Sequence, residues 1–201
     1  MKVELLNYTP LIIADKSISK CWDKGSDNVE PNKERMLRVA NKNKHKSTIE
    51  HVVYNFDIDG ISRACLQELS RHRIASLSVK SSRYTLHELK GAELHCDKHY
   101  EHYIHMTGNA VVDKASKQAL ANLQDLVQLG MSNDEIKYAM PECYLTSLVW
   151  TINMRSLQNF LELRSSKSAL KEIRDLAKAI YEEIPEEHKF MFEYIYEKEE
   201  K

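Results

Sequence analysis

The chain has 201 residues, 29% of them charged, and a formal net charge of −1. This length suffices for one domain with a substantial hydrophobic core. The near-zero net charge argues against a protein that binds nucleic acid or a membrane surface through its overall charge. No apolar run approaches the ~18 residues of a transmembrane helix.

The cysteines and the N-terminal residues predict the compartment. Four cysteines are scattered along the chain without a CxxC pair, which favours reduced thiols. An acidic residue stands near the start, and no signal-peptide core follows it. We therefore expect a cytoplasmic protein.

The first half of the chain predicts strands and short helices. Pro31 suits a first helical turn, and Asp59-Gly60 is expected to end a strand. In chain order, the prediction is a strand over 2–13, helices over 16–24 and 31–40, a polar helical turn over 45–50, a strand over 51–58 and a helix over 61–71.

The second half is richer in helices. Gly130 is expected to end a long amphipathic helix, Ser132 and Glu135 form a capping box, and Pro185 separates two helices. The prediction is strands over 83–88, 99–106 and 144–152, with helices over 109–129, 132–138, 154–163, 168–183 and 186–196. Without a regular βαβ alternation, this order favours an α+β fold, in which helices flank a mixed or antiparallel sheet. We expect a single domain over residues 1–201.

One segment concentrates cationic side chains. Arg71-His72-Arg73 is followed, after seven residues, by Ser81-Ser82-Arg83. Three guanidinium groups this close repel one another unless anions lie between them, and arginine forks match phosphate and carboxylate groups. The segment therefore predicts a site for phosphorylated small molecules. The Arg-His-Arg triplet is expected where a helix ends and a loop begins.

A second motif lies on the predicted helix over 154–163. Arg155, Asn159 and Leu163 are four residues apart and share one helix face. A guanidinium, an amide and an aliphatic chain together fit a ligand with a phosphate, polar ring edges and an apolar ring, such as FAD. The alternative is a solvated polar face. Arg164 ends the helix, where an arginine commonly neutralises the C-terminus.

Together, the two motifs resemble the signature of the flavin-dependent thymidylate synthases, from about His45 to Arg164. The resemblance implies that dUMP is methylated to dTMP, with methylenetetrahydrofolate as carbon donor, FAD as hydride carrier and NADPH as reductant. It also implies a homotetramer whose active sites are shared between subunits. The implied partners are these small molecules and further copies of the chain, with no nucleic acid and no membrane.

The resemblance also implies roles for individual residues. Arg164 would be catalytic, because it would lie against the pyrimidine and stabilise negative charge that develops there. No enzyme nucleophile is implied, so Ser81 is assigned to substrate phosphate. The implied cofactor-binding residues are Ser47, Glu50, Arg71, His72, Arg73, Val79, Asn153, Arg155 and Asn159. The implied substrate-binding residues are Glu68, Arg71, Lys80, Ser81, Ser82, Arg83, Lys137 and Arg164.

Some of these positions depart from the family pattern or have a structural alternative. Val79 stands where the family has Glu, so only its backbone can contact a nucleotide. Lys137 replaces an arginine, which keeps the charge and loses the fork. Ser47 and Glu50 also fit a helix cap and its capping-box partner.

The segment from His95 to His105 contains four histidines and one cysteine. These residue types suit zinc, but a spacing of three on the predicted strand alternates faces, so we expect a solvated strand and no metal. Two alternative functions remain at this point. One is a non-catalytic nucleotide- or nucleic-acid-binding module with salt-sensitive binding, against which the net charge and the second motif argue. The other is a metal-dependent enzyme centred on these histidines. No Rossmann or Walker A glycine pattern is present.

Overall fold

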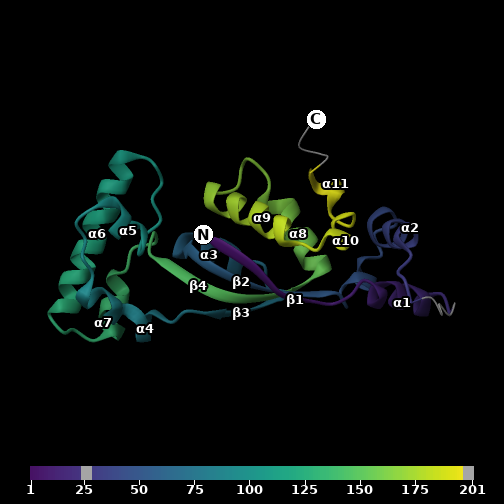
Figure 1. Cartoon of the computed structure of the whole chain (residues 1–201), viewed down its shortest axis with the longest axis horizontal. Coiled ribbons are helices and arrows are strands. Elements are labelled where there is room, and N and C mark those ends of the chain that lie inside the picture. Colours follow the sequence, from purple (N-terminus) through teal and green to yellow (C-terminus); the bar gives the residue numbers. More distant parts are fainter. Residues whose placement is uncertain (24–28, 197–201) are drawn as a thin grey trace. The chain divides into compact units, whose positions relative to one another are not determined.

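A computed structural model describes residues 1–23 and 29–196 (Figure 1). The strands are β1 Lys2–Tyr8, β2 Val53–Ser62, β3 Ala75–Val79 and β4 Leu145–Asn153. The α-helices are α1 Ile12–Cys21, α2 Lys33–Met36, α3 Arg63–Ser70, α4 Ser82–Thr85, α5 Asp97–Glu101, α6 Ala110–Gln128, α7 Asn133–Ile136, α8 Met154–Arg164, α9 Lys171–Glu183, α10 Glu186–Lys189 and α11 Glu193–Tyr196. A π-helix, η1 Leu37–Lys42, and the 3₁₀ helices η2 Lys46–Ile49, η3 Leu86–Gly91 and η4 Lys137–Ala139 complete the elements.

The four strands form one sheet in the order β1-β2-β4-β3. The end of β1 pairs with the start of β2, because the Thr9 amide donates to the Val53 carbonyl at 2.9 Å. The start of β1 lies against the end of β2, where Met1 meets Gly60. These two strands are therefore antiparallel. The predicted α+β fold with an antiparallel sheet and flanking helices is confirmed.

Residue contacts divide the chain into two compact units, which are described separately. We call them the α6 unit and the α8 unit after their central helices. The α6 unit comprises Met1, Ile58–Ser70 and Ser78–Leu148. The α8 unit comprises the described residues of Lys2–Asp57, Arg71–Leu77 and Val149–Lys201.

The α6 unit has an aliphatic core along one face of its long helix. Leu120, Leu123 and Val127 of α6 are buried against residues of η3 and α7 and against Ile104 and Tyr144. The Asn109 side chain caps α6 by accepting from the Val111 amide at 3.0 Å. The helix predicted over 109–129 is confirmed, because its cap and its apolar periodicity agree.

The α8 unit has an aromatic core. The Trp150 ring of β4 lies 6.2 Å from Phe56 of β2 and 5.1 Å from Phe160 of α8. The Asn153 side chain caps α8 by accepting from the Ser156 amide at 2.9 Å. Helix α9 lies beside α8 and against β1 (Figure 1). This core gives α8 a rigid base.

Three predicted strands need correction. The first ends at Tyr8 rather than at residue 13, because Leu11 is buried and residues 12–21 form the amphipathic α1. The strand over 83–88 is instead α4 followed by η3, whose Leu86 and Leu89 are three apart and both buried. The strand over 99–106 is instead α5 and a turn, with one bridge between Ile104 and Tyr144.

Other boundaries also differ from the prediction. Strand β2 continues through Asp59-Gly60 to Ser62, and Gly60 adopts φ +72° within it. Pro31 precedes the cap of α2 instead of lying in its first turn. Strand β3 was not predicted, and α9 begins at Lys171 rather than at 168. Lys24, at the end of the helix predicted over 16–24, lies outside the described residues.

A buried histidine makes the stability of the α8 unit depend on pH. The His188 side chain is fully buried, and its Nδ1 lies 2.7 Å from the Tyr54 hydroxyl. Burial lowers the pKa of His188 from 6.5 to about 4. The folded state therefore resists a proton that the unfolded chain accepts, so stability is full above pH 6.5 and falls as the pH drops towards 4. The loss attributable to this group is no more than about 3 kcal/mol.

We expect the urea midpoint of the protein to decrease from pH 7 to pH 4.5, and to decrease less in His188→Gln. Denaturation followed by fluorescence at several pH values measures both curves, and the difference between them isolates His188 from the carboxylates. Parallel curves for the two proteins would contradict the prediction.

Candidate functional site

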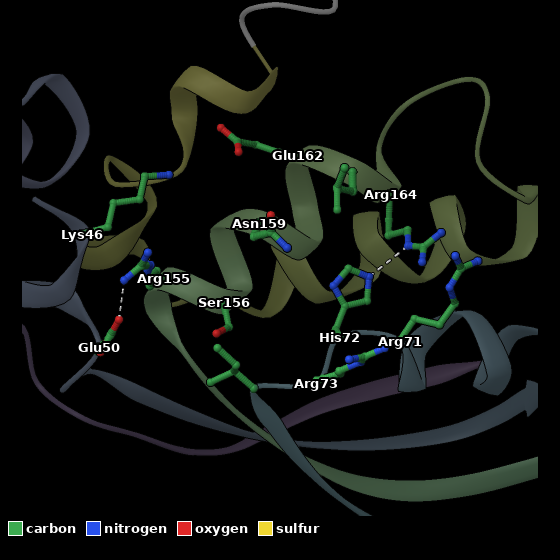
Figure 2. A pocket seen from close by; sticks show the side chains of 12 residues that line it. Lys46, Glu50, Arg71, His72, Arg73, Arg155, Ser156, Asn159, Glu162 and Arg164 are labelled. Carbon is green, nitrogen blue, oxygen red and sulfur yellow. Dashed lines mark hydrogen bonds and ion pairs between the residues drawn. The ribbon is translucent and has the colours of Figure 1, made fainter. Parts of the chain in front are cut away.

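A cavity of about 980 Å³ opens in the α8 unit (Figure 2). Its wall comes from η2 and the residue after it, from the loop between α3 and β3, and from one face of α8. Segment η2 and the residue after it contribute Lys46 and Glu50. The loop between α3 and β3 contributes Arg71, His72, Arg73 and Ile74. Helix α8 contributes Arg155, Ser156, Asn159, Glu162, Leu163 and Arg164.

The cavity wall carries an excess of positive charge. Five lining side chains are lysine or arginine, and two are glutamate. Cationic walls of a cleft concentrate anionic ligands. The volume lies at the upper end of the ~300–1,000 Å³ of small-molecule sites. The cavity therefore suits a large anionic molecule.

The face of α8 provides mixed chemistry. Arg155, Asn159 and Leu163 all line the cavity, which confirms that residues four apart share this face. Leu163 and Ile74 are 56% and 72% exposed. Two exposed aliphatic side chains beside guanidinium and amide groups offer an apolar surface next to hydrogen-bond donors.

Arg164 is held by His72, as the dashed line in Figure 2 shows. The Arg164 Nε donates to His72 Nε2 at 3.0 Å. The His72 ring is buried and stands edge-on to Phe160, with ring centroids 5.0 Å apart. Because an arginine can only donate, Nε2 carries the lone pair, and the proton of the neutral imidazole is on Nδ1.

Glu50 forms an ion pair across the cavity wall. Its Oε1 lies 2.6 Å from Nη1 of Arg155, and both side chains are about half exposed. The capping box considered for Ser47 and Glu50 is wrong, because η2 begins after His45 and Ser47 makes no side-chain cap. Ser47 and Asn153, both predicted to bind cofactor, are not among the lining residues, and Asn153 caps α8 instead.

Lys46, Ile74, Ser156 and Glu162 line the cavity but were not predicted. Ser156 and Glu162 fall on the helical repeat of the second motif, so periodicity could have found them. Lys46 donates to the hydroxyl of Tyr194 in α11 at 3.2 Å. Burial and the nearby Glu162 carboxylate raise the pKa of Tyr194. No local sequence signal connects α11 with residue 46.

The other predicted substrate residues belong to the α6 unit, together with Val79 of the predicted cofactor set. Glu68 lies on α3, Val79 and Lys80 at the end of β3, Ser81 to Arg83 at the start of α4, and Lys137 on η4. Two cations of this set, Lys80 and Arg83, form ion pairs within the unit. Lys80 Nζ lies 2.8 Å from Glu88 Oε2.

Arg83 is the second engaged cation. Its Nε and Nη2 donate to the two carboxylate oxygens of Asp134 at 2.5 and 3.0 Å. This pairing raises the pKa of Arg83 and lowers that of Asp134, to which the charge of Lys137 also contributes. The charges of Arg83 and Lys137 thus both act on the carboxylate of Asp134.

The histidine-rich segment folds differently from the prediction. His99 lies on α5, where its ring centroid is 6.3 Å from that of His95. Within residues 1–23 and 29–196, no group of three or more His, Cys, Asp or Glu side chains is placed to hold a metal ion. In the same ranges no helix is long and apolar enough to span a membrane.

Comparison with known proteins adds a family. The family model described as thymidylate synthase complementing protein matches residues 4–188. The chain is 54% identical over 198 residues to a flavin-dependent thymidylate synthase of Wolinella succinogenes, covering 96% of this chain and 97% of that protein. It is 49% identical over 203 residues to one from Helicobacter pylori (strain 26695), covering 96% and 98%.

A solved structure is also similar. The crystal structure of thymidylate synthase X from Helicobacter pylori with FAD and dUMP superimposes with a TM-score of 0.91. The sequences are 49% identical, and the match covers 97% of this chain and 98% of that chain.

The bond between Arg164 and His72 predicts the tautomer of the histidine. We expect nitrogen NMR of labelled protein at neutral pH to show His72 Nε2 without a proton. In Arg164→Leu, the donor to Nε2 is lost, and the Nε2 signal should shift from its position in the unsubstituted protein. The exposed His102 serves as control and should not change. A protonated Nε2 in the unsubstituted protein would contradict this geometry.

Proposed function

The chain belongs to the thymidylate synthase complementing protein family, the flavin-dependent thymidylate synthases, and we propose that its cavity binds FAD for the conversion of dUMP to dTMP. Methylenetetrahydrofolate supplies the carbon unit, and NADPH supplies the reducing equivalents. The observation that carries this proposal is the cationic cavity with a mixed polar and apolar face on α8. The alternative of a non-catalytic binding module is not supported, because the matching relatives are named as enzymes.

The residues of the cavity fit FAD. Its diphosphate is anionic, and Arg71, Arg73 and Arg155 provide forks for phosphate oxygens. The Asn159 amide can both donate to and accept from the polar edge of a flavin ring. Leu163 and Ile74 offer the apolar surface against which a ring can lie. The similar Helicobacter pylori structure contains FAD and dUMP, which supports the same pair of ligands here.

The reactive chemistry belongs to the cofactor, and the chain supplies position and charge. When bound, FAD supplies the hydride-transfer chemistry that the reaction needs. Arg164 provides a fixed cation for negative charge that develops on the pyrimidine. His72 fixes the direction of that cation, and Phe160 fixes the ring of His72. A donor oriented before the reaction costs no reorganisation when the charge appears.

The residues proposed to bind substrate are distributed over both units. Arg71 and Arg164 belong to the α8 unit, whereas Glu68, Lys80, Ser81, Ser82, Arg83 and Lys137 belong to the α6 unit. We propose that both sets bind dUMP, in a homotetramer that combines residues of different subunits in each active site. Ser47, Val79 and Asn153 are proposed to contact FAD at its edges, Val79 through its backbone. The four cysteines lie in the described part of the chain and form no disulfide there, which supports a cytoplasmic location.

Visible absorption tests the proposal directly. We expect the purified protein to retain added FAD through gel filtration, and the bound-flavin spectrum to shift when dUMP is added. The shift follows because both ligands occupy one site. A protein that retains no flavin, or whose flavin does not respond to dUMP, would refute the proposal.

Arg164→Ala tests the catalytic role. We expect dTMP formation to fall by a factor of at least about 10²–10³, as when a preorganised electrostatic donor is removed, while FAD stays bound. Product formation from dUMP and the flavin spectrum are measured on the same sample. Lys178→Ala removes an exposed cation of α9 and serves as control, with both readouts unchanged. Unimpaired turnover in Arg164→Ala would exclude the role.

A further inference from the structure

Arg83, which the proposed function assigns to the phosphate of dUMP, already holds an anion within its own unit. Its Nε and Nη2 donate side-on to both carboxylate oxygens of Asp134. The same fork is the one with which arginine binds phosphate bidentately. A phosphate that takes these two donors therefore displaces the carboxylate of Asp134.

The pair is accessible to such an exchange. The side chains of Arg83 and Asp134 are 55% and 61% exposed, so an incoming anion can reach the fork and burial locks neither partner. Exposed ion pairs contribute little to stability. A phosphate carries more charge than a carboxylate and forms strong charge-assisted hydrogen bonds with a guanidinium. A phosphate can therefore compete with the Asp134 carboxylate for the fork.

Arg83 does not depend on Asp134 for its backbone position. The side-chain amide of Asn133 donates to the Arg83 carbonyl at 2.6 Å. Helix α7, which carries Asp134, begins with a Ser132 cap that accepts from the Glu135 amide. Loss of the Asp134 charge thus leaves α4 and α7 joined, and it leaves the guanidinium in place to meet another anion.

A second cation stands beside the pair. Lys137 follows α7 directly, and its charge acts on Asp134. When the carboxylate swings away, Arg83 and Lys137 both face the incoming phosphate. The local charge of the site thus rises from +1 to +2 when Asp134 leaves it.

We propose that Asp134 is the resident anion of the substrate-phosphate site. It occupies the Arg83 fork in the nucleotide-free enzyme, is exchanged for the phosphate of dUMP, and so sets the affinity threshold for the substrate. This inference rests on the proposed function, because that function brings dUMP to Arg83.

The test compares two charge-neutralising variants. Asp134→Asn keeps the shape of the side chain and removes the competing charge. Asp97→Asn makes the same charge change in the same unit, at a residue that pairs with Lys117 at 2.6 Å and does not contact Arg83. The dissociation constant of dUMP is measured on FAD-loaded protein, and inorganic phosphate is titrated as a competitor. Circular dichroism confirms that both variants are folded.

We expect Asp134→Asn to bind dUMP about two- to fivefold more tightly, the range that loss of one exposed ion pair permits. Inorganic phosphate should compete more strongly by a similar factor, and the KM for dUMP should fall. Asp97→Asn should match the unsubstituted protein. Weaker binding in Asp134→Asn would show that Asp134 positions Arg83, and would overturn the exchange. Unchanged binding, or equal tightening in both variants, would also overturn it.

The same experiment separates this inference from the function on which it rests. If the unsubstituted, FAD-loaded protein binds no dUMP, the proposed function fails. The affinity of inorganic phosphate for the two variants then still decides whether Asp134 competes for the Arg83 fork. If dUMP binds but Asp134→Asn gives no gain, only the exchange fails.

Discussion

The α8 unit must hold several cationic side chains close together around one cavity. Five lysine and arginine side chains share its wall with two glutamates, and like charges at this density repel one another. Helix α8, which carries two of these cations, packs on an aromatic core on the side away from the cavity. Phe56, Trp150 and Phe160 form a chain of aromatic contacts from β2 through β4 to α8. Rigid packing of this kind keeps the cations in place until an anionic ligand neutralises them.

Local sequence signals correctly predicted the helices whose caps and apolar periodicity lie within their own segment. Helix α6 has an asparagine cap, an apolar stripe and a terminal glycine at φ +74°, and α8 has its own asparagine cap, so each signal agreed with the tertiary structure. The incorrectly predicted segments are short. Residues 83–91 and 97–106 contain few apolar positions, and the spacing of these positions fits the period of a strand as well as that of a helix. Their burial against α6 favours helical turns. Strand β3 has five residues, and its pairing partner β4 lies far along the chain.

The candidate site also has parts that are local in the sequence and parts that are not. The Arg-His-Arg triplet and the α8 face were predicted because residues close in sequence form them, and the structure brings both to one cavity. The contact of Lys46 with Tyr194 joins residues 148 positions apart, and no pattern in either segment indicates the other. The contacts of Arg83 with Asp134 and of Arg164 with His72 span 51 and 92 positions. The motifs identify the cations, whereas only the fold identifies their partners.

Arg164 and Arg83 donate to different kinds of acceptor. Arg164 donates to an imidazole nitrogen, an acceptor that fixes the direction of the donor. Arg83 is oriented by a carboxylate, which fixes direction and also cancels charge. A group that must stabilise charge in a transition state needs a fixed direction, and a hydrogen bond to an imidazole acceptor contributes to this. A group that must bind and release a substrate gains from an exposed partner of moderate strength, because an incoming anion can displace it. The chemistry of each partner thus matches the role proposed for its arginine.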